Sequence, residues 1–79
     1  MSSGYSQDNP FIREREILGG TIEKLRKHNK MTQEDLAEKS HINVSYLAKI
    51  ENGYVNTTVR YLIKIARGLK LKVKDLFEF

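Results

Sequence analysis

Residues 33–52 read QEDLAEKSHINVSYLAKIEN, and this stretch decides the fold. Its apolar residues recur at helical spacing in two short blocks, which a histidine–isoleucine pair and an asparagine separate. We predict a helix over residues 33–40, a tight turn at 41–42, and a second helix over residues 44–52 that Asn43 caps.

The residues around the two blocks support these boundaries. Thr32 precedes the first block and Asp35 stands three positions later, which is close to a capping box. Gly53 follows the second block, where glycine commonly ends a helix in a left-handed conformation. The side chains expected to pack the two helices together are Ala37, Ile42, Leu47 and Ile50. The sequence therefore predicts a helix-turn-helix.

The outer face of the second helix is predicted to consist of side chains that the core does not need. These side chains are Val44, Ser45, Lys49 and Asn52. A helix with such a face can enter the major groove of DNA, which is about 12 Å wide.

Apolar patterns on both sides of the motif predict further helices. One helix is expected over residues 10–28, capped by Asn9 and weakened in its middle by Gly19 and Gly20. The alternative is a helix that begins only near Thr21. Another is expected over residues 59–69 after a Thr58 cap. Its inward side chains should be Leu62, Ile63, Ile65, Ala66 and Leu69.

A short fifth helix is expected at about residues 73–78. No segment shows the alternation of a strand, so the predicted fold is all-α, a compact bundle of about five short helices. We expect residues 1–8 to be a disordered leader and residues 9–79 to form the helix-turn-helix domain.

Composition excludes several classes of protein. The chain has 79 residues and a net charge of +4, enough for one small basic domain. The absence of cysteine excludes disulfide scaffolds and cysteine-ligated metal sites. His28 and His41 have no acidic partner at ligand spacing, so neither a metal, a cofactor nor enzyme activity is expected.

No apolar run approaches the roughly 20 residues of a membrane span. The first residues also lack the basic start and apolar block of a secretory signal. We therefore expect a cytoplasmic protein with no membrane partner. No small-molecule ligand is expected, because no ligand domain fits in this length.

The runs TQEDLAEK at residues 32–39 and YLAKIENG at residues 46–53 resemble the Cro/lambda-repressor-type (XRE-like) helix-turn-helix family. The resemblance extends over about residues 18–77. It implies a five-helix domain that regulates transcription by binding an operator in double-stranded DNA, an inverted repeat, as a symmetric dimer.

The resemblance also implies roles for individual residues. The implied DNA-binding set is Thr32, Gln33, Asn43, Val44, Ser45, Tyr46, Lys49, Asn52 and Tyr54. Arg60 joins this set because the loop over residues 54–57 lacks the basic residues that many relatives have there. Within this set the base-reading positions are Asn43, Val44, Ser45 and Lys49. Gln33 is expected to donate to a phosphate and to brace a side chain of the second helix, and Tyr46 is expected to contact a phosphate or to pack at the turn.

Two further features follow from the resemblance. Arg26 and Glu51 match a family pair that forms a partly buried salt bridge. Lys30, His41 and Lys70 stand where the family usually has glycine in a left-handed conformation. Glycine at each of these three positions is therefore expected to stabilise the fold.

The C-terminal segment is rich in apolar residues, which indicates core closure, a dimer interface, or both. The residues assigned to the interface are Leu76, Phe77 and Phe79. Residues 60–74 contain six basic residues and no acid, which indicates either a solvated helix face or help in approaching DNA. Two alternatives stay open: an antitoxin-like protein-interaction module, and a nucleic-acid binder without sequence preference.

Overall fold

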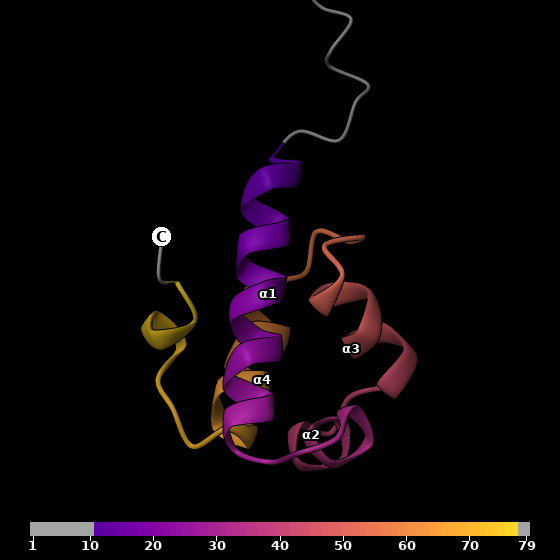
Figure 1. Cartoon of the computed structure of the whole chain (residues 1–79), viewed down its shortest axis with the longest axis vertical. Coiled ribbons are helices and arrows are strands. Elements are labelled where there is room, and N and C mark those ends of the chain that lie inside the picture. Colours follow the sequence, from indigo (N-terminus) through magenta and orange to yellow (C-terminus); the bar gives the residue numbers. More distant parts are fainter. Residues whose placement is uncertain (1–10, 78–79) are drawn as a thin grey trace, which may run out of the picture.

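The computed structural model describes residues 11–77, which form four α-helices and one short 3-10 helix (Figure 1). The elements are α1 (Ile12–His28), α2 (Gln33–Ser40), α3 (Val44–Glu51), α4 (Val59–Gly68) and η2 (Val73–Leu76). The described residues contain no strand. The predicted all-α class is confirmed. The prediction of a fifth helix over residues 73–78 is wrong, because η2 is a single 3-10 turn. The Phe77 amide donates to the Lys74 carbonyl at its end.

Helix α1 begins later than the sequence predicts. It starts at Ile12. Phe11 has a left-handed φ of 65° and therefore lies outside the helix. Asn9 and Pro10, the predicted cap and first residue, lie outside the described residues, as does the predicted leader over residues 1–8.

The glycine pair does not interrupt α1. Gly19 is buried where α1 crosses α3, and a Cβ added there would press against the Ile50 carbonyl oxygen and lie 2.6 Å from that of Glu51. Gly20 has no neighbour within 4 Å of the same added atom. Gly19 is therefore a packing residue that lets two helices approach, whereas Gly20 serves no visible contact.

The predicted caps of α2 and α3 are confirmed. Thr32 and Asp35 form a complete capping box, in which the Asp35 amide donates to Thr32 Oγ1 at 3.0 Å and the Thr32 amide donates to Asp35 Oδ2 at 2.9 Å. Asn43 Oδ1 accepts the amides of Ser45 at 2.8 Å and Tyr46 at 3.1 Å. Helix α3 ends at Glu51, one residue before the predicted end, and Gly53 has the expected left-handed φ of 74°.

Helix α4 starts at the predicted residue, where the Tyr61 amide donates to Thr58 Oγ1. It ends at Gly68, one residue early. The inward position predicted for Ile63 is wrong, because this side chain is 38% exposed on the outer face of the helix.

The core lies where the helices meet. Its buried apolar residues are Ile22, Leu36, Ala37, Leu47, Ile50, Leu62, Ile65, Ala66, Leu69 and Leu76. Helix α1 lies between α3 on one side and η2 on the other (Figure 1), and α4 packs against both α2 and η2. Three of the four side chains predicted to join α2 and α3 are buried, and Ile42 is half-buried against the core.

Three non-glycine residues at helix ends adopt the left-handed conformation that the sequence predicts. The φ angles are 59° at Lys30, 57° at His41 and 61° at Lys70, which follow α1, α2 and α4 respectively. After α4 the Leu71 amide closes the helix end by donating to the Ala66 carbonyl at 2.8 Å. The chain therefore accepts a conformational cost at each of these turns.

Candidate nucleic-acid interface

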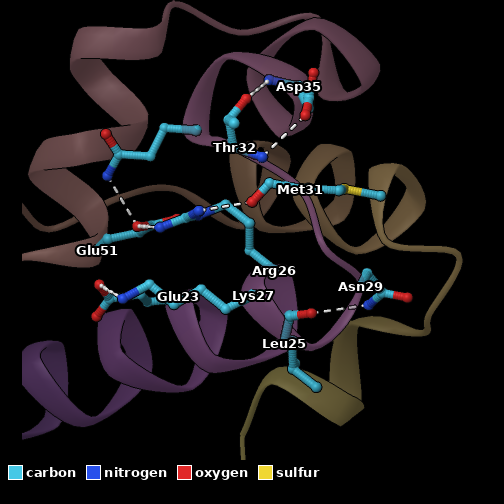
Figure 2. A network of polar contacts seen from close by, with 10 residues as sticks. Glu23, Leu25, Arg26, Lys27, Asn29, Met31, Thr32, Asp35 and Glu51 are labelled. Atoms are coloured by element: carbon cyan, nitrogen blue, oxygen red, sulfur yellow. Dashed lines mark hydrogen bonds and ion pairs between the residues drawn. The ribbon is translucent and has the colours of Figure 1, made fainter.

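A buried polar network fixes α3 in place (Figure 2). Arg26 on α1 donates from Nε to Glu51 Oε2 at 2.8 Å and from Nη2 to Glu51 Oε1 at 3.1 Å. Gln33, the first residue of α2, donates from Nε2 to the same Oε1 at 2.9 Å. Arg26 Nη1 donates to the Met31 carbonyl at 2.8 Å. One carboxylate at the end of α3 is thereby bound to α1, to α2 and, through Arg26, to the segment between them.

The network confirms the predicted salt bridge and enlarges it. The side chains of Arg26 and Glu51 are only 8% and 2% exposed, and the hydrogen bond to Glu51 raises the pKa of Arg26 above its ordinary value. The predicted brace from Gln33 to the second helix is present, with Glu51 as its acceptor. Sequence reasoning missed the Met31 carbonyl, because nothing in the residue type marks a backbone acceptor.

The predicted base-reading side chains all lie on α3 or at its start. Asn43, Ser45 and Lys49 are exposed, whereas Val44 is half-buried against the core. Because α3 turns its Leu47 and Ile50 inward, Ser45 and Lys49, one helical turn apart, are left on the outer surface. The face therefore offers a hydroxyl, an ammonium and part of an isopropyl group.

Capping restricts what Asn43 can do. Its Oδ1 already accepts two backbone amides, and among residues 11–77 its Nδ2 group has no partner. Reading of an adenine by an asparagine needs both the oxygen and the nitrogen of the amide. Asn43 in its capping position is therefore a donor, to a base acceptor or to a phosphate, and not a bidentate reader.

The predicted phosphate-contacting residues lie at the helix starts and in the segment after α3. Gln33 begins α2, and Arg60 is the second residue of α4 and is exposed. Asn52 and Tyr54 are exposed in the segment after α3, Tyr54 by 71%. The Thr32 hydroxyl accepts the Asp35 amide within the capping box and also interacts with the Asp35 carboxylate.

Tyr46 packs against another side chain, which agrees with one of its two predicted roles. It is half-buried, and its ring lies 4.8 Å from the ring of Tyr61 on α4, centroid to centroid. This pair brings the first turn of α3 beside the first turn of α4, which carries Arg60. The predicted base-reading and phosphate-contacting side chains of these two helices are thus brought near each other.

A contact that the sequence did not indicate anchors the end of α3 to α1. Arg15 Nε donates to the Gly53 carbonyl at 3.1 Å. A Cβ on Gly53 would lie 3.0 Å from the Cα of Glu16, so α1 passes directly against this backbone. The segment that carries Asn52 and Tyr54 therefore starts from a fixed point.

The structure corrects part of the predicted dimer interface. Leu76 is fully buried within the chain itself, because η2 packs between α1 and α4, and it cannot offer its side chain to a partner. Phe77 is 47% exposed. Phe79 lies outside the described residues.

Two features are absent from residues 11–77. No group of three or more His, Asp or Glu side chains in this range is placed to hold a metal ion. No helix in the same range combines the length and the apolar character that crossing a membrane requires.

A helix-turn-helix whose second helix is held by a buried salt bridge, with an exposed polar outer face, defines a class of nucleic-acid-binding fold. Comparison with known proteins agrees with this class. The helix-turn-helix family matches residues 22–76, and the chain belongs to that family.

Individual relatives share this region. The immunity repressor of Bacillus phage phi105 is 39% identical over 59 residues, which are 75% of this chain and 41% of the repressor. This chain therefore spans about two fifths of that relative's length. Among solved structures, the restriction-modification controller protein C.AhdI from Aeromonas hydrophila superposes with a TM-score of 0.81 at 28% identity, over 82% of this chain and 98% of its own.

The structure of the restriction-modification controller protein C.Esp1396I, solved as a tetramer with its natural 35-base-pair operator, superposes with a TM-score of 0.77. It is 34% identical to this chain and covers 89% of it, and the match covers 90% of the controller.

Proposed function

We propose that this protein is a sequence-specific DNA-binding regulator of transcription. The observation that carries the proposal is α3, which is fixed from behind by the Arg26–Glu51 salt bridge and presents Ser45 and Lys49 to solvent. A rigid helix with an exposed polar face is what direct readout in the major groove requires.

The side chains on α3 match the chemistry of base edges. The Lys49 ammonium suits the O6 and N7 acceptors of guanine, and the Val44 methyl groups suit the methyl group of thymine. Ser45 can donate or accept and therefore discriminates least. We propose the full set named from the sequence as the DNA-contacting residues, with Lys49 as the main reader of bases and Arg60 as a phosphate contact.

The relatives support an operator as the target. The matched Bacillus phage protein is named an immunity repressor, and C.Esp1396I was solved as a tetramer with its operator. We propose that two copies of this chain place their α3 helices in successive major grooves, about 34 Å apart, on an inverted repeat.

We propose the outer face of α4 as the surface where the second copy binds. Val59 and Ile63 lie one helical turn apart on it and are 68% and 38% exposed. A groove between α4 and η2 adjoins them, lined by the apolar side chains of Ile63, Leu71 and Val73 and by the basic residues Arg67 and Lys72. Leu76 is buried in the core of its own chain and does not contact the partner.

A pair of variants tests this surface. Ile63→Asp places a charge on it, whereas Ile17→Asp changes a side chain on α1 with the same 38% exposure. Sedimentation equilibrium of the full chain should show dissociation for Ile63→Asp and the wild-type association for Ile17→Asp. Equal association of both variants would show that the interface lies elsewhere on the chain.

We also propose that the protein acts without catalysis or a cofactor, as a cytoplasmic regulator with residues 9–79 as its DNA-binding domain. The support is the family and the make-up of the proposed site, which consists of neutral polar, apolar and cationic side chains around helix starts.

Selection from a randomised duplex library at fixed salt tests the proposed function. Enrichment of an inverted repeat is the expected result. A library that stays flat while binding persists would identify a general nucleic-acid binder instead, and no binding at all would favour a protein-interaction module.

A further inference from the structure

A series of side-chain contacts links α4 to the helix-turn-helix. The ring of Tyr61 on α4 is inclined by 48° to that of Tyr46 in the first turn of α3, with the centroids 4.8 Å apart. Lys64, three residues further along α4, places Nζ 5.6 Å from the centroid of the Tyr61 ring. The same Nζ donates to the His41 carbonyl at 3.5 Å. The contacts thus run from the turn before α3 to the first turn of α3.

Each contact is of a favourable kind. Tilted aromatic pairs at this separation gain from the charge distribution of the rings. An ammonium near an aromatic ring is attracted to its electron-rich face. His41 holds the left-handed conformation that closes α2, and its carbonyl receives a cationic donor. Lys64 thereby interacts with both the turn and the aromatic pair.

The position of this linkage is significant because α3 packs its backbone mainly against α1 and α2, while α4 packs against α2 and η2. The two tyrosine rings therefore provide a direct side-chain link between α3 and α4. Tyr46 follows Ser45, a proposed base reader, and Tyr61 follows Arg60, a proposed phosphate contact. The link joins the turn of α3 that carries a proposed reader of bases to the turn of α4 that carries a proposed phosphate contact.

We propose that Tyr61 and Lys64 are positioning residues for base recognition, which hold the first turn of α3 in its reading orientation without touching DNA. The inference rests on the proposed function and adds to it two residues on α4. Hydrogen bonds to base edges need precise placement, whereas attraction to phosphate tolerates a shift. Loss of the link should therefore reduce discrimination between sequences more than it reduces binding.

Two rival roles make different predictions. If Lys64 contacted a phosphate, its removal would weaken all duplexes alike and reduce the salt slope by about 0.9 for one contact. If Tyr61 served stability alone, its truncation would lower the melting temperature and leave the discrimination of the folded protein unchanged.

The test uses the full chain with four variants: Tyr61→Ala, Tyr61→Phe, Lys64→Met and, as a control of equal charge, Lys24→Met. Lys24 is exposed on α1, opposite buried Ile22. For each variant the Kd is measured on the selected duplex and on a scrambled duplex of equal length over a salt series. Thermal melts ensure that only folded protein is compared.

We expect Tyr61→Ala and Lys64→Met to lower the ratio of the two affinities by about three- to tenfold, the scale of one aromatic or cation–π contact. The affinity for the scrambled duplex and the salt slope should stay at the wild-type values in Tyr61→Ala and at the values of Lys24→Met in Lys64→Met. Tyr61→Phe, which keeps the ring, should retain the wild-type ratio.

An unchanged ratio in both Tyr61→Ala and Lys64→Met would overturn the inference alone, as would a uniform loss with a smaller salt slope in Lys64→Met. A lower ratio of the two affinities in Tyr61→Phe would also overturn it, because the hydroxyl and not the ring would then be responsible for the effect. A wild type with no preference between the duplexes would overturn the proposed function together with this inference.

Discussion

The guanidinium of Arg26 meets the carboxylate of Glu51 in two hydrogen bonds, Nε to Oε2 at 2.8 Å and Nη2 to Oε1 at 3.1 Å, almost entirely out of water. Removing one partner leaves a buried charge that nothing compensates. Since Glu51 is the last residue of α3, the same contact sets the stability of the domain and the orientation of the proposed reading helix.

Glu51→Ala should destabilise the protein by about 3–5 kcal/mol, the scale of a broken buried pair. Glu23→Ala is the matched control, because Glu23 pairs with Lys27 at 3.1 Å with side chains 42% and 65% exposed. The loss of stability in Glu23→Ala should stay within about 0.5 kcal/mol. Denaturant melts of both variants measure the difference, and equal costs would show that burial of the Arg26–Glu51 pair does not matter.

The two neighbouring glycines of α1 should respond oppositely to alanine. Gly20→Ala should stabilise by about 0.5–1 kcal/mol, because alanine is the better helix former and the added methyl group meets open space. Gly19→Ala should destabilise by about 1–3 kcal/mol, since its methyl group must push α3 away at the Ile50 and Glu51 carbonyls. Thermal melts measure both, and a stabilising Gly19→Ala would refute the close crossing of α1 and α3.

Glycine should stabilise the three left-handed turns. The three variants Lys30→Gly, His41→Gly and Lys70→Gly each remove a side chain from a residue with φ near 60°. Each should raise the free energy of unfolding by about 1 kcal/mol, a net value that allows for the greater entropy of the unfolded glycine chain. Lys24→Gly, at an exposed position within α1, should instead cost about 1 kcal/mol. Melting midpoints that fall for all three turn variants would contradict the account.

Acid should weaken the capping box of α2. The backbone hydrogen bond from Thr32, followed by the bond with its side chain, lowers the pKa of Asp35 below its ordinary value of 3.8. The folded state thus favours the charged carboxylate, so its contribution is fully present well above pH 3.8 and is lost as the pH falls through the lower folded pKa. The difference in stability between wild type and Asp35→Ala should therefore shrink below about pH 4. A difference that grows on acidification would reverse the assigned sign.

Local signals in the sequence predicted the parts of this structure that depend on few residues. Thr32 with Asp35, and Asn43, mark helix starts by chemistry that acts over two or three residues, and both caps formed as expected. The pairing of Arg26 with Glu51 was predicted from family resemblance, and the structure contains it.

The errors concern properties that only the packed chain determines. Gly19 marked a weak point in α1 by its propensity, whereas its real role is the crossing with α3. Ile63 and Leu76 are both apolar, and nothing in their types shows that the first faces solvent and the second fills the core. The Arg15 bond to the Gly53 carbonyl joins residues 38 positions apart, and a backbone acceptor leaves no mark in the sequence.

The central claim is that α3 reads bases while the first turns of the neighbouring helices contact the DNA phosphate backbone. The most direct test measures the binding of Lys49→Ala and Arg60→Ala to a panel of single-base variants of the selected operator. Lys49→Ala should lose preference at one or two base pairs of each half-site, at a cost of about 1–3 kcal/mol. Arg60→Ala should weaken every duplex equally and reduce the salt slope by about one phosphate contact. The reverse pattern, with uniform loss in Lys49→Ala and relaxed preference in Arg60→Ala, would contradict the account.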